Sequence, residues 1–292
     1  MNSYQINRYI ISCYLTFIIL LFSSVGFAQQ VPLASGFFTD KYLQNSAKYG
    51  ISAENSLLLG IRNNVANNHA NQNEQLINLN LNRNTHGFGA GIHNINSGSF
   101  KHTSLQASYA HHLLFDNPGH MLSLGTSLSY TSENIDLKKI EGDTNDPTLL
   151  DFNRRTNKLD LDLGVAYSVS DVDIQLSVNN ILAKKTTYFL VNKSRLFSSV
   201  SYTIETASRL RFSPQVSYRK LLNDNDVLDL GGAVAFNPNF QLFALYHSNQ
   251  NITTGMNLNI KKFKFNFAYL KGTSGIQRNT AECLEFALGY RW

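Results

Sequence analysis

The chain ends in the stretch Leu284-Glu285-Phe286-Ala287-Leu288-Gly289-Tyr290-Arg291-Trp292, in which the even-numbered positions are all apolar or aromatic. Successive side chains of a strand point to opposite faces, so one face of this segment is wholly apolar and the other is small or charged. A strand that closes an outer-membrane β-barrel has this pattern. Its terminal aromatics, here Tyr290 and Trp292, would then be the signal read by the assembly machinery. A soluble edge strand alternates in the same way, so the rest of the chain must separate the two.

The beginning of the chain predicts export. Arg8 is followed by the apolar run Tyr9–Phe22 and then by Gly26-Phe27-Ala28. A basic start, a short apolar run and small residues before a cleavage point are typical of a secretory signal peptide. The run has 14 residues, whereas a membrane-spanning helix needs about 20. We therefore expect residues 1–28 to be cleaved after Ala28.

Composition narrows the class of the exported chain. Without residues 1–28 it has 24 basic and 20 acidic residues, a mild charge of +4 with no basic block, which gives no support for nucleic-acid binding. Cys13 leaves with the signal peptide and Cys283 remains alone, which excludes an intramolecular disulfide and a cysteine metal site. No later apolar run is long enough for a spanning helix. A barrel strand also has no long apolar run, because its lipid-facing apolar residues alternate with lumen-facing polar ones.

Runs of about ten alternating residues fill the chain from residue 53 onward. In 262–270, for example, Phe263, Phe265, Phe267 and Tyr269 alternate with Lys, Asn and Ala. In 157–168, leucines alternate with aspartates and small residues in the same manner. The sequence predicts fourteen strands, within a range of 12–16, near 53–62, 75–83, 87–95, 102–112, 120–132, 157–168, 172–180, 195–205, 208–219, 226–236, 239–248, 251–260, 262–270 and 282–292.

Two features favour a closed transmembrane barrel over a two-sheet sandwich. Short and long connections alternate along the chain, as in barrels with short periplasmic turns and longer extracellular loops. The polar faces are rich in Gly, Ser, Ala and Asn, which suit a crowded lumen better than a solvated sheet. We therefore predict an all-β fold, a closed antiparallel barrel over residues 53–292. Residues 29–52 do not alternate, and they form either a periplasmic arm or a plug.

Candidate chemical groups are few. His111 and His112 are neighbours, so on a strand they face opposite sides and cannot bind one metal ion. The glycine-rich run 87–91 has no helix after it that could present a phosphate site. No nucleophile or zinc motif is found, so we expect no catalytic residue, no metal and no cofactor. An outer-membrane enzyme remains the least favoured of three functional hypotheses.

Charged residues gather on the predicted lumen faces. Charges of both signs there would either pair across the lumen and hold the barrel rigid, or grip a polypeptide or plug. The candidates for partner binding are Arg209, Arg211, Asp229, Asp160 and Asp162. Further charges on the same faces are Arg219, Asp173, Lys262, Lys264, Glu285 and Arg291.

Several ordered segments resemble the PorP/SprF family of type IX secretion system membrane proteins. Members open with Asn-Pro-Ala-x-x-Gly, and residues 45–50 read Asn-Ser-Ala-Lys-Tyr-Gly without the proline. A loop of Asp-Pro-Asn-Asp-Pro type is matched by residues 143–147, and a Ser-Val-Pro-Asn-Leu-Leu strand end by 177–182. The strand motif Leu-Arg-Phe-x-Pro recurs at 210–214, and the family's ending recurs at 285–292. The lost prolines and short loops indicate a divergent member.

The resemblance implies a non-enzymatic outer-membrane barrel that accompanies type IX secretion and gliding motility. Such a protein would support export or surface retention of a large secreted protein, for example an adhesin, through that protein's C-terminal region. The expected partners are this secreted protein, the secretion machinery, the β-barrel assembly machinery and outer-membrane lipid. The alternative is an outer-membrane channel for a small solute or a fatty acid.

Overall fold

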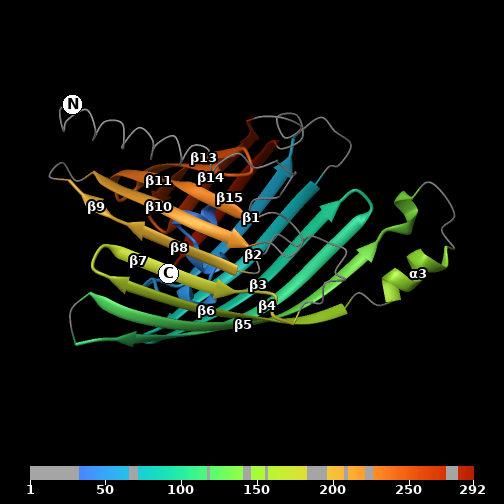
Figure 1. Cartoon of the computed structure of the whole chain (residues 1–292), viewed down its shortest axis with the longest axis horizontal. Helices are drawn as coiled ribbons and strands as arrows, with labels where there is room; N and C mark the ends of the chain where they lie inside the picture. The colour runs from blue at the N-terminus through green and yellow to red at the C-terminus, as the bar shows by residue number, and fades with distance from the viewer. Residues whose placement is uncertain are drawn as a thin grey trace, which may run out of the picture.

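The computed structural model describes residues 33–65, 72–116, 119–140, 146–154, 157–182, 196–206, 210–220, 226–273 and 282–292. Within these ranges fifteen strands form one antiparallel sheet (Figure 1). They are β1 (Ser56–Asn64), β2 (Gln72–Arg83), β3 (His86–Ser97), β4 (Phe100–Leu114), β5 (His120–Ile135), β6 (Asn157–Val169), β7 (Val172–Val178), β8 (Leu196–Tyr202), β9 (Ile204–Glu205), β10 (Arg211–Lys220), β11 (Val227–Asn237), β12 (Phe240–His247), β13 (Asn251–Ile260), β14 (Phe263–Gly272) and β15 (Glu282–Arg291).

The sheet closes on itself. β1 pairs with β15 along its whole length, from Ser56 opposite Arg291 to Asn64 opposite Cys283, and β10 pairs with β11. β8 and β9 both pair with β10 and are separated by Thr203 alone, so they count as one interrupted strand of the barrel wall. The barrel wall therefore has fourteen strands, which confirms the predicted fold and strand number. Closure leaves no open sheet edge to lipid, as a membrane barrel requires.

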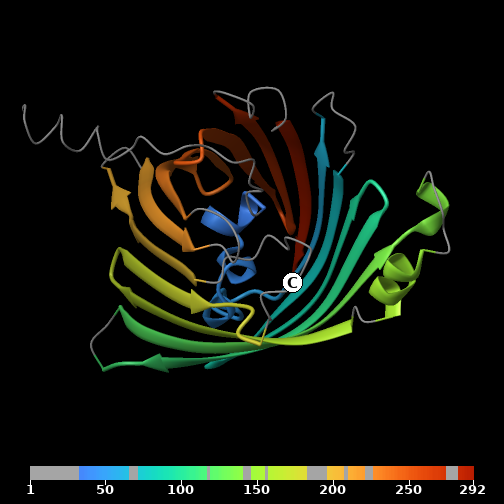
Figure 2. The same ribbon diagram turned by 45° about the vertical axis from the view of Figure 1, so that its right-hand side comes forward.

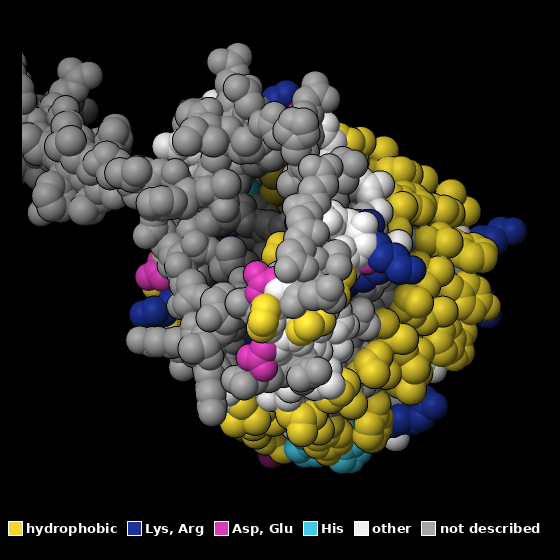
Figure 3. Space-filling model, turned by 90° about the vertical axis from the view of Figure 1, so that its right-hand side faces the viewer, with side chains coloured by type: hydrophobic (Ala, Val, Ile, Leu, Met, Phe, Trp, Pro, Cys, Tyr) yellow, Lys and Arg dark blue, Asp and Glu magenta, His cyan; other side chains and the backbone are white. Residues whose placement is uncertain are grey.

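The alternation of each strand sets the two faces of the wall. On β6, Leu159 and Leu163 are 59% and 49% exposed, while Asp160 and Asp162 between them are buried. On β14 the exposed residues include Phe263 and Phe267. The predicted outward face is thus confirmed on both strands. Figure 3 shows hydrophobic side chains over the part of the outer wall on the right of that view.

Helical structure is short. The described helices are α2 (Ser35–Phe38), α3 (Pro147–Arg154) and the 3-10 turns η1 (Lys41–Leu43), η2 (Ser46–Lys48) and η3 (Leu137–Lys139). Of the residues that the structure describes, none belongs to a helix long and apolar enough to cross a membrane.

Connections separate the two ends of the barrel. At one end the turns are tight, and Asn84, Ser170 and Lys261 adopt positive φ angles of 59°, 48° and 53° in them. At the other end the connections are longer, with two exceptions, the turns at 98–99 and 248–250. The predicted strand bounds had already left only two residues, 249–250, for the second of these turns. Barrels of this class place short turns in the periplasm and long loops outside the cell. We call the two ends the short-turn end and the long-loop end.

The face assignment predicts how charge is tolerated on β6. Leu163→Arg should lower the free energy of unfolding by about 2–4 kcal/mol, because an arginine then faces hydrocarbon. Asp160→Asn, on the opposite face, keeps the oxygen that accepts the Leu182 N–H and should be mild. The measurement is the amount of heat-modifiable, folded barrel. Equal losses in the two variants would contradict the assignment.

Candidate functional site in the barrel lumen

The lumen contains a segment of the chain itself. Residues 33–50, which we call the inner segment, carry α2, η1 and η2 and lie inside the barrel wall (Figure 2). Its side chains are largely buried: Phe37 is 1% exposed, Asn45 and Ala47 are 0%, and Tyr49 is 1%. In an open, water-filled lumen these residues would be solvated. The inner segment is therefore packed against the wall.

Glycines on the lumen face let the inner segment approach the wall closely. A Cβ atom on Gly125 of β5 would lie 2.2 Å from the Ala47 backbone nitrogen, and one on Gly164 of β6 would lie 2.0 Å from Asn45 Oδ1. Gly87 and Gly89 of β3 make equally close contacts with Tyr49. Any larger residue at these four positions would require the inner segment to move. We call the four glycines the glycine floor: Gly87, Gly89, Gly125 and Gly164.

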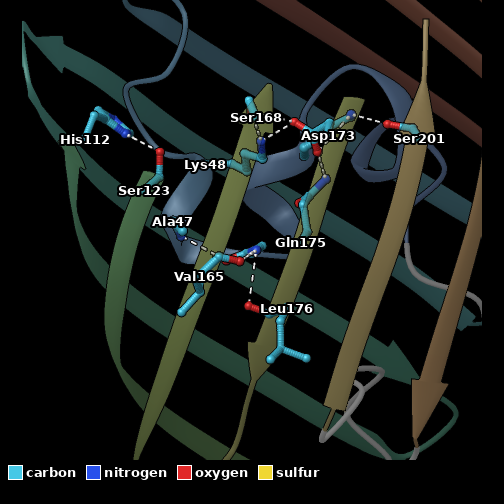
Figure 4. Close-up of polar contacts among 12 residues, drawn as sticks. Ala47, Lys48, His112, Ser123, Val165, Ser168, Asp173, Gln175, Leu176 and Ser201 are labelled. Atoms are coloured by element: carbon cyan, nitrogen blue, oxygen red, sulfur yellow. Dashed lines mark hydrogen bonds and ion pairs between the residues drawn. The ribbon is translucent and has the colours of Figure 1, made fainter. Parts of the chain in front are cut away.

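Asn45 fastens the inner segment to two neighbouring strands. Its side-chain oxygen accepts the Ala47 N–H at 3.0 Å and so caps η2. Its amide nitrogen donates to the carbonyl of Val165 on β6 at 3.1 Å and to that of Leu176 on β7 at 3.4 Å (Figure 4). One asparagine side chain thus joins a turn to the wall, a role that a hydrophobic residue could not fill.

The end of the inner segment is held by polar contacts on three strands. Tyr49 accepts a hydrogen bond at its hydroxyl from Asn78 of β2 at 2.8 Å. His112 of β4 bonds through Nε2 to the Tyr49 carbonyl at 2.9 Å and through Nδ1 to Ser123 of β5 at 2.8 Å. Asn80 accepts the Gly50 N–H at 2.7 Å. These bonds satisfy the backbone where the chain leaves the lumen and joins β1.

Ion pairs anchor both sides of the inner segment. Lys48, 3% exposed, pairs with Asp173 of β7, which also lies 3.6 Å from the Lys41 amine (Figure 4). Burial lowers the pKa of the Lys48 amine, and Asp173 opposes that shift. Across the lumen, Asp40 accepts hydrogen bonds from Lys264 of β14 at 2.8 and 2.9 Å. Each pair links the inner segment to the wall at low exposure, where solvent screening is weak.

Near the beginning of the inner segment, α2 covers a buried ionic cluster of the wall. Arg219 of β10 makes a bidentate pair with Asp229 of β11 at 2.7 and 2.8 Å. His247 of β12 bonds to the same carboxylate at 2.6 Å and to Thr253 of β13 at 2.8 Å. The Phe37 ring lies over this cluster, 5.7 Å from the Arg219 guanidinium carbon.

A second ionic cluster meets the start of the inner segment. Arg62 of β1 bonds to Glu74 of β2 at 3.2 Å and to Glu285 of β15 at 3.0 Å. Glu285 also accepts the Ala34 N–H at 2.8 Å. Since β15 closes the barrel against β1, the Arg62–Glu285 pair spans the closing seam, and the inner segment docks on it.

Comparison with known proteins shows the family to which this barrel belongs. A family model described as type IX secretion system membrane protein PorP/SprF matches residues 26–290. The chain belongs to this family. No curated protein matches the sequence.

Solved structures share the fold of this PorP/SprF-family barrel. The Pseudomonas putida toluene transporter TodX has 10% identity and a TM-score of 0.52, covering 90% of this chain and 94% of its own. The CymD monoaromatic hydrocarbon channel has 12% identity and a TM-score of 0.50, covering 91% and 94%. Acinetobacter baumannii Omp33 has 6% identity and a TM-score of 0.50, covering 82% and 98%. At such identities the likeness is one of fold alone.

Family and fold together locate the protein in the outer membrane, and its membership implies partners in the secretion machinery. Neither the PorP/SprF family nor the outer-membrane barrel is an enzymatic kind. In the described part of the chain, no group of three or more His, Cys, Asp or Glu residues is placed to hold a metal ion.

The structure places the three aspartate candidates predicted from the sequence in two different environments. Asp229 lies in the ionic cluster with no exposed surface. Asp160 and Asp162 are buried and accept the backbone N–H groups of Leu182 and Asn180 just after β7.

Of the arginine candidates, only Arg211 lies among the described residues. Arg211 is at the short-turn end, where its guanidinium pairs with Glu205 at 2.6 Å and its side chain is 58% exposed. Arg209 lies outside the described residues. Lys262, which was expected to face the lumen, is exposed in the turn before β14, because a turn residue is not held to either face of the sheet.

Several residues that build the site were not among the predicted candidates. Asn45, Lys48 and Tyr49 belong to the motif that resembled the family, so the motif itself was the available signal. His112 and His247 are buried hydrogen-bonding residues that the sequence did not mark as site residues. Each became recognisable only through its partner on another strand.

Proposed function

We propose that this PorP/SprF-family barrel serves type IX secretion by holding a large secreted protein, such as an adhesin, at the cell surface, and that it does not pass solutes freely. One observation carries the proposal: residues 33–50 are packed and ion-paired inside the lumen. A barrel of fourteen strands is wide enough to leave space in its lumen. Filling that space with its own chain favours a protein-contact role over free diffusion.

The pairing of the lumen charges supports the same function. Asp229 pairs with the Arg219 guanidinium and hydrogen-bonds to His247, and Arg62 pairs with both Glu74 and Glu285. Buried charges paired in this way hold neighbouring strands together, and a lumen with charges of both signs is poorly suited to selecting one kind of ion. Of the two roles considered for these charges, we therefore assign Asp229 to internal scaffolding.

The N-terminal region has a separate place in this proposal. We assign residues 29–52 to a plug, supported by the burial of residues 33–50, and residues 1–28 to a cleaved signal peptide. The plug would keep the outer membrane sealed while the barrel engages its partner.

Deleting the gene tests the function. We expect loss of surface display or release of one specific large protein, with nutrient uptake unchanged. Affinity purification of the tagged wild type from native outer membrane should recover that protein together with secretion-machinery components. Recovery of the barrel alone, with normal surface display in the deletion strain, would overturn the proposal.

Arg211 at the short-turn end and Arg209, which lies outside the described residues, are candidates for partner contact. Arg209→Ala together with Arg211→Ala should weaken retention of the partner without unfolding the barrel, because the Arg211 side chain is solvated. Retention is measured as the fraction of partner that stays cell-bound, with heat modifiability as the folding control. Full retention in the double variant would assign these arginines to scaffolding.

The second candidate is a channel for a small solute. The observation that favours it is the likeness in fold to a toluene transporter and a monoaromatic hydrocarbon channel. Purified wild type in planar bilayers decides between the two. Discrete open-channel conductance would support the channel, whereas a silent bilayer supports the holding function.

We also propose that Tyr290 and Trp292 form the signal for the β-barrel assembly machinery. Their rings stack at 5.9 Å on the outward face, and Trp292 is 47% exposed. Deleting Trp292 should lower the outer-membrane level of the barrel while leaving export across the inner membrane intact. The test compares outer-membrane and periplasmic amounts by immunoblot. Normal outer-membrane levels after deletion would mean that β15 is an ordinary closing strand.

A further inference from the structure

The outward face of the wall changes character toward the long-loop end of β1 to β6. One row of residues directly opposite one another across these strands is apolar. It consists of Leu59, Ile77, Ile92, Leu105, Tyr130 and Leu159. This row belongs to the band that contacts hydrocarbon.

The next rows toward the long-loop end are polar. In register one step beyond the apolar row on β2 to β6 lie Gln75, Asn94, Thr103, Ser132 and Asn157. The row after that, on β1 to β5, is Asn63, Asn73, Asn96, Lys101 and Asn134. We call these two rows the outer polar face. None of its residues is buried.

The outer polar face belongs to one side of the barrel. β2 to β6 have 12 to 16 residues each, whereas β7 and β8 have seven each. A tilted strand of about 9–11 residues already spans the bilayer, so the long strands continue past the hydrocarbon. On β10, β12 and β14 the outward residues near the strand ends are Tyr218, Tyr246 and Tyr269, an aromatic border with little strand beyond it.

Position and chemistry together indicate what meets this face. Directly beyond the hydrocarbon lies the headgroup layer of the outer leaflet. The outer polar face has no aromatic, Met or Arg residue, and these are the types enriched in protein interfaces. Its one cation, Lys101, lies 2.9 Å from the Asp136 carboxylate, so the face is poorly suited to phosphate.

Amides and hydroxyls both donate and accept hydrogen bonds, as sugar hydroxyls do. Side chains of the face are already ordered by one another: Asn73 donates to Asn63 at 2.6 Å, and Thr103 donates to Asn94 at 3.1 Å. Such ordering reduces the entropy lost on binding. We propose that the outer polar face binds the neutral saccharide part of an outer-leaflet glycolipid.

The test uses full-length barrel in phospholipid nanodiscs and measures lipid binding by native mass spectrometry. The probes are rough lipopolysaccharide, which carries a core saccharide, and lipid A, which lacks it. Wild type should prefer the former. Combining Asn94→Ala, Thr103→Ala and Ser132→Ala should reduce that preference about tenfold, since several modest hydrogen bonds are lost. Thr254→Ala, which removes an outward hydroxyl from β13, is the matched control and should change nothing.

Three results would overturn the proposal. Equal binding of both probes by wild type would assign recognition to acyl chains or phosphate. A triple variant that keeps the full preference would remove these side chains from the site. Loss of a co-purifying protein, with the saccharide preference intact, would assign the face to a protein partner. If the triple variant fails heat-modifiability, Asn94→Ala alone is measured against the same control. Failure here leaves the holding function untouched, because retention of the secreted protein is assayed separately.

Discussion

Gly125→Val is expected to release the inner segment from the wall and open the barrel. A Cβ at this position would lie 2.2 Å from the Ala47 backbone nitrogen, and the obstructing atoms are backbone, which cannot rotate away. Overpacking of this kind costs about 1–3 kcal/mol or more, and here the strain falls on the contacts of one short segment. Purified Gly125→Val in planar bilayers should show discrete conductance steps where wild type is silent.

Two further measurements make this expectation specific to the glycine floor. Gly60→Val is the matched control, because a Cβ on Gly60 would meet its neighbours at an ordinary 3.7–3.8 Å. Ser46→Cys, in a Cys283→Ser background, reports exposure: Ser46 is 5% exposed, so maleimide should label it only when Gly125→Val is also present. A silent, unlabelled Gly125→Val that still folds would show that the inner segment does not close the lumen.

Asp229→Asn should produce the largest loss of stability among single substitutions in the wall. The change leaves Arg219 buried without its bidentate carboxylate and deprives His247 of its charged partner. Breaking a buried pair by removing one partner costs about 3–5 kcal/mol, since an uncompensated charge remains in a poorly solvated site. The urea concentration at the midpoint of unfolding should fall by an amount that reflects this loss of stability. Unfolding is carried out in detergent and monitored by heat modifiability.

The control for this prediction is an exposed ion pair of β10, the strand that also carries Arg219. Arg211→Ala removes the partner of Glu205 at a solvated rim, where surface ion pairs contribute little. A combined Arg219→Met and Asp229→Leu variant, which removes both charges of the bidentate pair, should recover much of the lost stability. If Asp229→Asn and Arg211→Ala shifted the midpoint equally, the cluster under Phe37 would not be a structural anchor.

The alternating pattern of the sequence was sufficient for the wall. Side-chain direction in a strand depends on the parity of the residue number, so the outward position of Leu163 and the inward position of Asp162 follow from spacing alone. The alternation of short and long connections and the small residues on the polar faces then separated a barrel from a sandwich. These are local properties, and they carried the fold class, the strand number and the two faces.

The contents of the lumen were decided by tertiary structure. Residues 45–50 carry no period, and their sequence was equally consistent with a loose arm. Their position depends on Gly125 and Gly164, which lie about 80 and 120 residues away and come together only when the strands pair in register. The same holds for Arg62 and Glu285, which meet because β15 closes against β1. Sequence alone determined which side of the wall each residue faces, whereas barrel closure determined which residues meet across it, because closure brings distant parts of the chain within contact distance.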